Sequence, residues 1–324
     1  MKKVGIIGGA GYTGGEAVRL LLNHPEVELA FVQSASNAGN LLSDVHTDLL
    51  GDTSMRFTAE ADDADVLVIC SGHGKARKWL EANAVSPSTL IIDLSQDFRL
   101  AESSRLGERQ FVYGLPELNR AKIEGAKSIA NPGCFATCLQ LGLLPLAAAG
   151  LLSGDVHISA TTGSTGAGQK PSASTHFSWR ANNLSTYKAF DHQHLHEIGE
   201  SILGLQPSWG GEILFIPSRG AFTRGIFASI YTTSDLTEQQ AIDLYKEFYR
   251  DAAFTFVSDR AVDLKQVVNT NKCVLRIEKH GDKLLITSVI DNLLKGASGQ
   301  AVQNMNLALG IDERAGLRLK ATAF

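Results

Sequence analysis

A short apolar run, a glycine-rich turn and a helical segment open the chain, and they constrain its fold more than any other feature. Residues 3–7 are mostly apolar and stop at Gly8, which predicts a buried strand of a parallel sheet. Residues 16–23 follow with apolar side chains at helical spacing. Between this strand and this helix, Gly8, Gly11 and Gly14 follow one another at intervals of three residues. Such spacing is typical of turns whose backbone N–H groups approach a pyrophosphate at a helix N-terminus. An ordinary tight turn also uses glycines, but this position favours a dinucleotide site.

The residues after the second predicted strand indicate which dinucleotide would bind. This strand covers residues 27–33. Sites that prefer NAD usually place a carboxylate at this point to hold the ribose 2′-hydroxyl. Residues 33–37 contain no carboxylate, and the hydroxyls of Ser34 and Ser36 suit a 2′-phosphate. The sequence therefore favours NADP, although no arginine or lysine stands in this segment.

Two further apolar runs, at residues 65–70 and 89–93, predict more strands of the same sheet. Strands that alternate with helices are typical of a doubly wound α/β domain of the Rossmann type. In such a sheet the ligand lies beyond the carboxyl ends of the strands. We therefore expect residues directly after these two strands to line the cofactor cleft: Ser71, Gly72, His73 and Ser95. His73 could equally be an ordinary loop histidine.

The composition excludes several classes of protein. Lys and Arg number 30 against 34 Asp and Glu, so no positive excess predicts binding to nucleic acid or to an anionic membrane. No stretch approaches the roughly 18 apolar residues of a membrane span, and the first residues do not resemble a signal peptide. The four cysteines are too few and too scattered for a disulfide framework, which favours a reducing, cytoplasmic setting.

Cys134 begins an apolar helix predicted over residues 134–149. Pro132 and Gly133 precede it and give a sharp turn into the helix. In the first turn of a helix, free N–H groups and the helix dipole stabilise a thiolate, the form of cysteine that attacks acyl groups. A buried, unreactive thiol is the alternative for Cys134, and it is what we expect of Cys138 one turn later.

Three histidines at alternate positions form a second group of chemical interest. His192, His194 and His196 would point to one side of an extended strand, where neutral imidazoles could bind zinc. However, no cysteine lies near them in the sequence, no His-Glu-x-x-His helix is present, and a cysteine nucleophile needs no metal. We therefore expect no metal site and a general acid–base role for one of these histidines, with a solvated surface as the remaining alternative.

The pattern changes from residue 155 on, where strands of a mixed or antiparallel sheet are predicted. They cover residues 156–162, 213–217, 225–232, 274–279 and 284–290. Residues 236–249 form an amphipathic helical pattern, and residues 279–282 give a hairpin turn signal. Residues 296–309 predict a last helix of small and apolar residues. This part of the chain would be an α+β catalytic and subunit-contact domain.

Seven short motifs are spread over essentially the whole chain. They are residues 8–14 (GGAGYTG), 92–100 (IDLSQDFRL), 113–118 (YGLPEL), 131–134 (NPGC), 163–168 (GSTGAG), 217–220 (PSRG) and 291–301 (DNLLKGASGQA). Together, and in this order, they resemble the N-acetyl-gamma-glutamyl-phosphate reductases, NADP-dependent enzymes of arginine biosynthesis. The resemblance implies a fold shared with aspartate-semialdehyde dehydrogenase and glyceraldehyde-3-phosphate dehydrogenase.

The resemblance also implies how the domains and the site are made. The NADP-binding domain would comprise residues 1–133 and 297–324, because the last helix returns to it, and residues 134–296 would form the catalytic domain. Cys134 would be the acylated nucleophile, and subunits would assemble as a dimer or tetramer. The cofactor would lie against these residues: Gly8, Gly11, Tyr12, Thr13, Gly14, Gly163, Gly166, Asn292 and Gly296.

The histidine motif departs from the family pattern. That pattern resembles His-Arg-His-x-x-Glu-Ile, whereas residues 192–198 of this chain are HQHLHEI. Gln193 replaces the arginine and His196 is an additional imidazole. The catalytic histidine therefore corresponds to His194 or His192, and we expect His194 to fill the role.

The implied substrate is an acyl phosphate that also carries a carboxylate. Arg99 and Arg219 are candidate anion-binding residues, because a guanidinium pairs with either group, although each could instead be structural. The expected reaction is the NADPH-dependent conversion of N-acetyl-glutamyl 5-phosphate to the semialdehyde through a cysteine thioester. The alternatives are the same chemistry on an N-succinyl-glutamyl, aminoadipyl or aspartyl phosphate, or a non-catalytic NADP-binding regulator.

Overall fold

The computed structural model describes residues 1–323, which divide into two compact units. The first unit consists of Met1–Gly133 and Ala297–Arg318, and the second of Cys134–Gly296 together with the chain from Leu319 on. Residues 319–323 were expected in the first domain but belong to the second unit. In that unit the Thr322 N–H donates to the Val268 carbonyl at 3.2 Å, which ties this end of the chain down.

A parallel sheet of seven strands forms the centre of the first unit, as the structure describes it. The strand order is β3-β2-β1-β4-β5-β9-β8. The strands are β1 (Lys2–Ile7), β2 (Val27–Gln33), β3 (Phe57–Thr58), β4 (Val66–Ile69), β5 (Leu90–Asp93), β8 (Val112–Tyr113) and β9 (Ser128–Ala130). The four runs predicted from the sequence are β1, β2, β4 and β5, and the doubly wound α/β class is confirmed. The other three strands are only two or three residues long, too short to show a periodicity.

Five helices of the first unit surround this sheet in the described residues. They are α1 (Tyr12–Leu22), α2 (Leu42–Val45), α3 (Ala76–Ala82), α4 (Pro116–Ile123) and α9 (Gly299–Leu309). A small separate hairpin is formed by β6 (Arg105–Leu106) and β7 (Arg109–Gln110). The first helix begins at Tyr12, earlier than residue 16, so the end of the glycine-rich turn is already helical.

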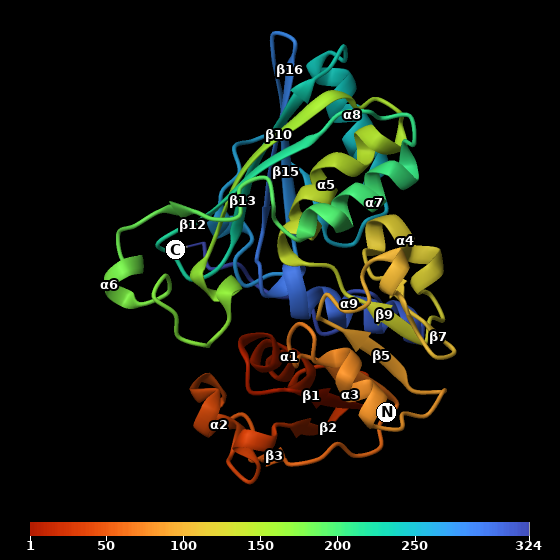
Figure 1. Cartoon of the computed structure of the whole chain (residues 1–324), viewed down its shortest axis with the longest axis vertical. Coiled ribbons are helices and arrows are strands. Elements are labelled where there is room, and N and C mark those ends of the chain that lie inside the picture. The colour runs from red at the N-terminus through yellow and green to blue at the C-terminus, as the bar shows by residue number, and fades with distance from the viewer. Residues whose placement is uncertain (324) are drawn as a thin grey trace. The chain divides into compact units, whose positions relative to one another are not determined.

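The last helix, α9, belongs to the first unit although it begins 166 residues after Gly133 in the sequence. It packs on α1, α4 and β5, and Figure 1 shows it in blue beside the red α1. Buried amides fix its position: Asn304 donates from Nδ2 to the Gly114 carbonyl at 2.8 Å and to Asn131 Oδ1 at 3.0 Å. A π-helical turn, Leu294–Ser298, precedes it, which is where the sequence predicted the helix to begin.

The second unit contains a mixed sheet of seven strands among the described residues. The strand order is β11-β12-β10-β13-β16-β15-β14. The strands are β10 (Ser153–Thr162), β11 (Ser185–Thr186), β12 (Ile213–Arg219), β13 (Ile226–Thr233), β14 (Thr255–Val257), β15 (Cys273–His280) and β16 (Lys283–Ile290). β10 is parallel to β12 and β14 to β15, and the remaining pairs are antiparallel. The predicted mixed sheet is confirmed.

Helices cover one face of this sheet, as Figure 1 shows for α5 (Cys134–Ala148), α7 (His194–Leu205) and α8 (Glu238–Phe248). The strand residues beneath them are fully buried: Ile158, Ala160, Phe215, Ala228, Ile230 and Ile286. The alternate residues point to the opposite face because side chains alternate along a strand. Several of them are partly exposed, including Ile216 and Tyr231.

The most apolar helix of the chain is α5, which is buried on nearly every side. Such a helix needs packing all round, and here α7, α8 and the strands β13, β15 and β16 supply it. A short helix, α6 (Phe177–Arg180), lies instead in the long connection between β10 and α7. In the described part of the chain no helix is both long and apolar enough to cross a membrane.

Candidate active site

The glycine-rich turn leaves no room for larger side chains at three of its positions, Gly8, Gly9 and Gly14. Gly8 has φ +73°, and a Cβ there would lie 2.7 Å from Cα of Ser71. A Cβ on Gly14 would lie 2.3 Å from the Gly9 carbonyl oxygen. Gly11 is the N-cap of α1, with open space where a side chain would be and no side-chain cap. The helix therefore starts with N–H groups that no side chain caps, next to open space, as an anion site requires.

His46 supports this turn from behind. It is buried, and its Nε2 lies 2.8 Å from the Gly9 carbonyl oxygen. Gly15 makes room for the ring, since a Cβ there would lie 2.6 Å from His46 Nδ1. The C=O and N–H of a trans peptide point in opposite directions, so a Gly9 carbonyl held by His46 turns the Ala10 N–H to the other side. No local pattern marked His46, because it lies 37 residues beyond its partner.

The loop after β2 gathers the two serines that the sequence assigned to the cofactor. Asn37 Nδ2 donates to the hydroxyl oxygens of both Ser34 and Ser36, at 3.1 Å each. Ser34 is buried and Ser36 is exposed. Arg56 reaches the same loop from the start of β3 and donates to the Gly39 carbonyl at 2.7 Å. Arg56 therefore places a positive charge at Gly39, two residues beyond the segment 33–37.

The loops after β4 and β5 are joined to each other. The Gln96 N–H donates to His73 Nδ1 at 3.1 Å, and the Gly74 N–H donates to Asp97 Oδ1 at 2.7 Å. The hydroxyl oxygen of Ser71 is buried and has no hydrogen-bond partner within the described residues. An orphaned hydroxyl beside the glycine-rich turn fits a hydrogen bond to a bound nucleotide.

Ser95 takes part in hydrogen bonds within its own loop. Its hydroxyl donates to Asp93 Oδ2 at 2.7 Å and accepts from the Asp97 N–H at 3.0 Å, so its proton is used inside the loop. Its own N–H donates to Asp93 Oδ1 at 2.9 Å. Burial raises the pKa of Asp93 to about 6, against the opposing effects of Ser95 and of the Arg99 charge. Ser95 therefore shapes the loop with Asp93, and its place in the cofactor cleft stays a prediction.

Arg99 donates hydrogen bonds to two main-chain carbonyls. It is buried, its Nε donates to the Asn131 carbonyl at 2.8 Å, and one terminal nitrogen donates to the Leu94 carbonyl at 2.9 Å. The sequence left open whether Arg99 binds substrate or supports the fold, and these main-chain bonds favour support. Asn131, whose carbonyl accepts from Arg99, lies three residues before Cys134.

The candidate nucleophile, Cys134, is the first residue of α5 and is partly exposed. A Cβ on Gly296 would lie 2.8 Å from Cβ of Cys134, so a larger residue at position 296 would displace the cysteine. Cys138 is fully buried, and its Sγ lies 3.3 Å from the Ser288 hydroxyl oxygen. Burial raises the pKa of Cys138 well above the usual value. The two thiols on this helix therefore differ in access to solvent.

The histidine cluster straddles the start of α7, which begins at His194. His192 and His194 are buried, and their ring centroids lie 5.4 Å and 6.4 Å from that of Phe135, the residue after Cys134. His196 is exposed, because residues two apart point to different sides of a helix. The three histidines therefore do not lie in the extended strand that would have placed all of them on one side to bind zinc. Among residues 1–323 no group of three or more His, Cys, Asp or Glu is arranged to hold a metal ion.

The two buried histidines are in different electrostatic surroundings. Burial, together with the Lys188 charge, lowers the pKa of His192 to about 4. Its Nδ1 accepts the His194 N–H at 3.2 Å, so the proton of the neutral ring is on Nε2. Nε2 of His194 lies 4.0 Å from a carboxylate oxygen of buried Glu197. Glu197 stands in the motif noted above, yet the sequence alone gave it no role.

Arg219 keeps free donor capacity near this cluster. Its Nε is buried and has no partner within the described residues, and its guanidinium lies 4.7 Å from the ring centroid of Tyr187. The Tyr187 ring in turn lies 5.8 Å from that of His192. Burial, and to a lesser degree the Cys134 charge, raises the pKa of Tyr187 to about 12, so its hydroxyl stays protonated. No periodic pattern marked Tyr187, which the pairing of β11 with β12 brings to this position.

The remaining candidate cofactor residues of the second unit share one network. Asn292 accepts the Gly225 N–H at 2.7 Å and donates to the Thr165 hydroxyl at 3.0 Å, which leaves one amide N–H uncommitted in these bonds. A Cβ on Gly163 would lie 2.3 Å from the Thr223 carbonyl oxygen. Gly166 lies beside Thr162, whose buried hydroxyl has no partner within residues 1–323.

Known protein families match both units. The family "Semialdehyde dehydrogenase, NAD binding domain" matches residues 3–126, and "Semialdehyde dehydrogenase, dimerisation domain" matches residues 134–292. Among solved structures, aspartate semialdehyde dehydrogenase II of Vibrio cholerae superposes with a TM-score of 0.71 at 16% identity, covering 96% of this chain and 98% of that one. The NADP-bound enzyme of Candida albicans gives 0.69 at 14%, over 96% and 99%. These likenesses show a shared fold.

Curated relatives are much closer in sequence. Two proteins named N-acetyl-gamma-glutamyl-phosphate reductase, from Bacteroides thetaiotaomicron and Christiangramia forsetii, are 56% and 57% identical to this chain, and both alignments cover 100% of each protein. The relative from Flavobacterium johnsoniae is 54% identical over the same full extent. With the motifs, the fold and the candidate nucleophile in place, this chain belongs to the N-acetyl-gamma-glutamyl-phosphate reductase family.

Proposed function

We propose that this chain reduces N-acetyl-glutamyl 5-phosphate to N-acetyl-glutamate 5-semialdehyde with NADPH, a step of arginine biosynthesis. The observation that carries the proposal is the surroundings of Cys134. The thiol stands at a helix N-terminus and is partly exposed, and two buried histidines pack against the next residue, Phe135. Full-length relatives named for this substrate support the choice of acyl phosphate.

The chemistry would proceed on the Cys134 sulfur. The thiolate attacks the acyl carbon, the bond from that carbon to the phosphate oxygen breaks, and inorganic phosphate leaves a thioester behind. When bound, NADPH supplies the hydride that reduces this thioester. The Cys134 N–H, at the start of α5, is a candidate donor to the oxygen that becomes negative during the attack. Release of the aldehyde returns the electron pair to the sulfur.

His194 would hold and move the proton in these steps. It takes the proton from the thiol before attack and protonates the departing groups. The surroundings of the two histidines support His194 over His192. A His192 ring with a pKa of about 4 carries almost no proton to donate at neutral pH, whereas His194 has a carboxylate oxygen of Glu197 4.0 Å from its Nε2. His192 instead accepts the His194 N–H and so orients the start of α7.

Arg219 and Tyr187 would recognise the anionic groups of the substrate. An arginine whose buried Nε has no partner within residues 1–323 has donors to offer a carboxylate or phosphate. Tyr187 packs on the guanidinium and remains a hydroxyl donor at neutral pH. Arg99, by contrast, already donates hydrogen bonds to main-chain carbonyls.

The cofactor would be NADP. The cradle made by Gly8, Gly11 and Gly14 and the orphaned Ser71 hydroxyl fit the pyrophosphate part of a dinucleotide. Ser34, Ser36 and Asn37 form a cluster without a carboxylate, which fits a 2′-phosphate, and Arg56 adds positive charge to the same loop. Tyr12 and Thr13 belong to the proposed cofactor site because they form the first turn of α1.

The setting of the enzyme follows from the same features. The match to a dimerisation domain supports assembly of identical subunits. The four cysteines, Cys70, Cys134, Cys138 and Cys273, are free thiols in the structure, which fits a reducing compartment such as the cytoplasm.

The test is the reverse reaction, in which phosphate and a semialdehyde drive reduction of NADP. A panel of N-acetyl-glutamate, N-succinyl-glutamate, aminoadipate and aspartate semialdehydes should give the highest kcat/KM for the N-acetyl compound. Preference for the N-succinyl compound would change the acyl group and keep the chemistry. Preference for aspartate semialdehyde, or turnover without phosphate, would contradict the proposal.

The cofactor preference has its own measurement in this assay. The value of kcat/KM should be higher with NADP than with NAD, and Arg56→Gln should reduce that preference while leaving turnover with NAD nearly unchanged. Equal use of the two cofactors by the unmodified enzyme would refute the interpretation of the Ser34–Ser36 loop.

A further inference from the structure

We infer that Arg224 and Asp291 are positioning residues for the candidate nucleophile, Cys134. Their ion pair fixes the turn of residues 291–296, and the main chain of Gly296 in this turn lies against the cysteine. The pair therefore sets the place from which the sulfur attacks. The inference rests on the proposed function only in taking this cysteine as the nucleophile, and the reactivity of the thiol is measured without substrate.

The carboxylate of this pair is fully buried and has a fixed geometry. The Arg224 guanidinium donates from Nε to Oδ2 of Asp291 at 3.0 Å and from Nη2 to Oδ1 at 3.2 Å. Main-chain N–H groups complete the set, because Asn269 donates to Oδ2 at 2.7 Å, and Leu293 and Leu294 donate to Oδ1 at 2.8 Å and 3.1 Å. Both carboxylate oxygens thus accept from the arginine and from the main chain, which leaves the carboxylate one orientation.

The turn after β16 links this carboxylate to the nucleophile. Asp291 holds the turn at both ends, because its carboxylate accepts from the second and third residues after it and its carbonyl accepts the Gly296 N–H at 2.9 Å. A Cβ on Gly296 would lie 2.8 Å from Cβ and 3.2 Å from Cα of Cys134, so only a bare main chain fits there. The Cα–Cβ bond of the cysteine is therefore in contact with a main-chain segment that Asp291 keeps in place.

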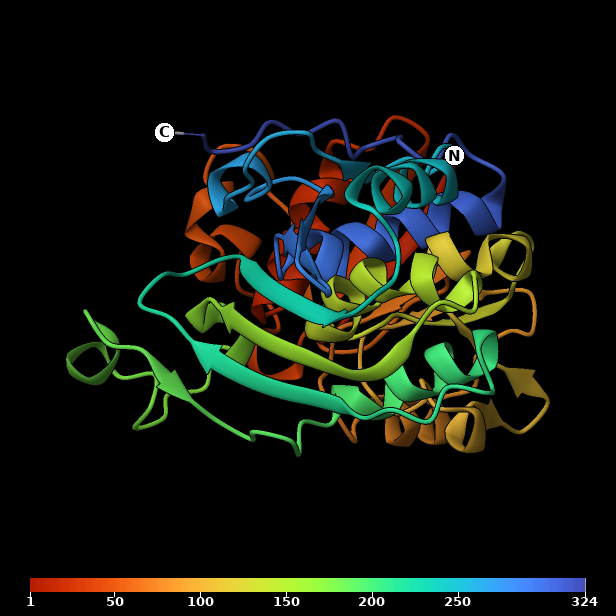
Figure 2. The same ribbon diagram turned by 90° about the horizontal axis from the view of Figure 1, so that it is seen from above.

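Arg224 is itself held by the loop that joins β12 to β13. Since β10 lies between these two strands, the loop crosses over the end of β10, which Figure 2 shows as the yellow-green arrow between two bluish-green ones. At one side of this crossing the Gly220 N–H donates to the Thr162 carbonyl at 2.9 Å. At the other side the Gly163 N–H donates to the Gly225 carbonyl at 2.9 Å. The guanidinium thus extends from an anchored main chain.

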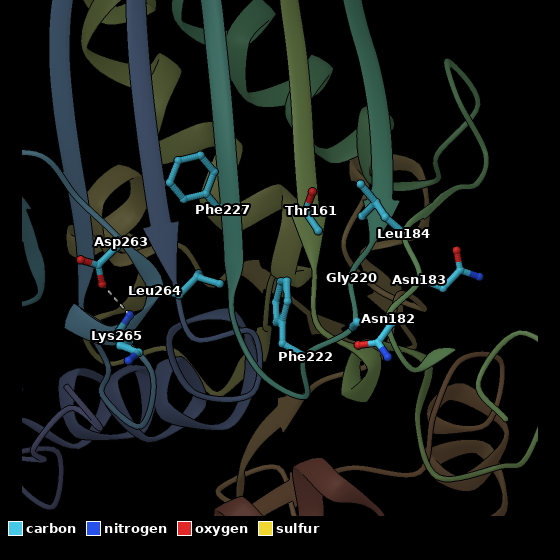
Figure 3. Close-up of a pocket in the computed structure, with 11 residues that line it drawn as sticks. Thr161, Asn182, Asn183, Leu184, Gly220, Phe222, Phe227, Asp263, Leu264 and Lys265 are labelled. Atoms are coloured by element: carbon cyan, nitrogen blue, oxygen red, sulfur yellow. Dashed lines mark hydrogen bonds between the residues drawn. The ribbon is translucent and has the colours of Figure 1, made fainter. Parts of the chain in front are cut away.

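The end of this loop is also bonded and packed beside the carboxylate. The Gly225 N–H donates at 2.7 Å to Oδ1 of Asn292, the residue after Asp291. Gly225 has φ +115°, and a Cβ there would lie 2.8 Å from Cδ2 of Leu264. Figure 3 shows that Leu264 and Phe222, which belongs to the loop, line one pocket. A side chain at position 225 would therefore push the loop, and the arginine with it, away from the carboxylate.

Loss of the ion pair should change the rate of reaction and not the binding of substrate. A buried ion pair often contributes no more stability than apolar side chains would, so stability alone does not account for this one. What the pair supplies is position, and a displacement of about 1 Å at a reacting atom can cost about 100-fold in rate. Arg219 and Tyr187, the candidate substrate-binding residues, are held by contacts of their own. We therefore expect a lower kcat and a nearly unchanged KM.

The experiment uses Arg224→Met, which removes the charge, and Arg224→Lys, which keeps the charge but not the two parallel donors. Gly296→Ala tests the contact with Cys134 directly. Arg120→Met is the matched control, because it breaks another ion pair with a nearly buried carboxylate, that of Glu313 in the first unit. Urea unfolding, and kcat and KM in the reverse reaction, are measured for each protein. Mass spectrometry follows the rate at which iodoacetamide alkylates Cys134 without ligands, from pH 6 to 9.

Arg224→Met should lower kcat by about 100-fold and Arg224→Lys by about tenfold, with KM for phosphate and semialdehyde within about threefold. In Arg224→Met, alkylation of Cys134 should slow by about tenfold at pH 7, because a displaced sulfur is less well stabilised as a thiolate by the helix N-terminus. The slowing should disappear towards pH 9, where the thiol ionises without that help. Gly296→Ala should show both changes, whereas Arg120→Met should lose stability but neither kcat nor alkylation rate.

Two outcomes would contradict the role of the ion pair. One is a kcat for Arg224→Met within about threefold of the unmodified enzyme, and the other is an equal loss of kcat in Arg120→Met. If Arg224→Met does not fold, Arg224→Lys and Gly296→Ala decide by the same measurements. If the unmodified enzyme turns over no semialdehyde, the proposed function fails separately. Slower alkylation in these variants would then still support the positioning of Cys134, and unchanged alkylation would overturn it.

Discussion

The two units present their site residues by different means. In the first unit the candidate site is made mainly of backbone: three glycines, the uncapped start of α1 and short polar loops. In the second unit it is made of buried side chains from separate elements, with Cys134 on α5, His194 and Glu197 on α7, and Arg219 on β12. A pyrophosphate can be held by N–H groups that every residue has, whereas proton transfer needs particular side chains in fixed positions. Single substitutions should therefore cost far more in the second unit.

The largest effect is expected for Cys134→Ser. Turnover should fall below detection, because the hydroxyl is far less ionised than a thiol at neutral pH and cannot form the thioester. NADP affinity, which depends largely on the first unit, should stay within about twofold of the unmodified enzyme if the comparison holds. Cys138→Ser is the control and should keep most activity. If Cys138 proved essential instead, the assignment of the nucleophile to the first turn of α5 would be wrong.

The next largest effect is expected for His194→Asn. Its kcat should fall by about 10²- to 10⁴-fold, the range for a positioned acid–base group. Alkylation of Cys134 by iodoacetamide should remain possible, because the helix N-terminus still favours the thiolate. His196→Asn, on the exposed side of α7, should change kcat little. If His192→Asn alone abolished turnover, the proton would have to be assigned two residues upstream.

Acid should act on the two units in opposite directions. The folded-state pKa of His192 is about 4, below its usual 6.5, so between pH 6.5 and 4 the unfolded chain binds a proton that the folded chain does not. The contribution of His192 to the free energy of unfolding is complete above pH 6.5. It falls by about 3 kcal/mol as the pH is lowered towards 4. Asp93, with a pKa raised to about 6, does the reverse, and acidification from pH 6 to 3.8 stabilises the folded first unit.

Urea unfolding of the unmodified protein, His192→Gln and Asp93→Asn between pH 7 and 4.5 checks both signs. As the pH falls, His192→Gln should become less destabilising relative to the unmodified protein. Asp93→Asn should become more destabilising over the same pH range. Parallel profiles for all three proteins would show that neither group is buried in the way described.

The smallest effect is expected for His46→Ala in the first unit. Loss of one hydrogen bond to the Gly9 carbonyl should raise KM for NADPH by about three- to tenfold, with kcat nearly unchanged. His46→Gln should restore much of the affinity, because its amide can donate to the same carbonyl. A hundredfold rise in KM, or a fall in kcat of similar size, would mean that the first unit depends on single side chains as strongly as the second.

The sequence was sufficient wherever the determining interactions are local. Residues 27–33 are a strand with the predicted bounds, since an apolar run between polar turns specifies a buried strand without reference to the rest of the chain. The glycine spacing and the position of Cys134 at a helix start are local in the same sense. The pattern of residues 192–196 was ambiguous, because Gln193 at the helix N-cap makes no side-chain cap that would have marked a helix.

The roles of polar residues depended on partners far away in the sequence. Arg99 binds the carbonyl of Asn131, 32 residues later, and Tyr187 reaches Arg219 through a strand pairing. Neither a residue type nor its spacing shows which carbonyl or ring will lie beside it after folding. For the same reason His46, Arg56 and Glu197 entered the candidate site only with the structure.

The return of α9 to the first unit has a consequence for synthesis of the chain. About 160 residues of the second unit are made between Gly133 and Ala297, which at roughly 5 to 20 residues per second takes on the order of 10 to 30 seconds. During that time α1, α4 and β5 lack the helix that packs on them, and the Gly114 carbonyl lacks the amide of Asn304. The nascent first unit therefore stays incomplete on the ribosome, and the unit that begins first is completed only near the end of translation.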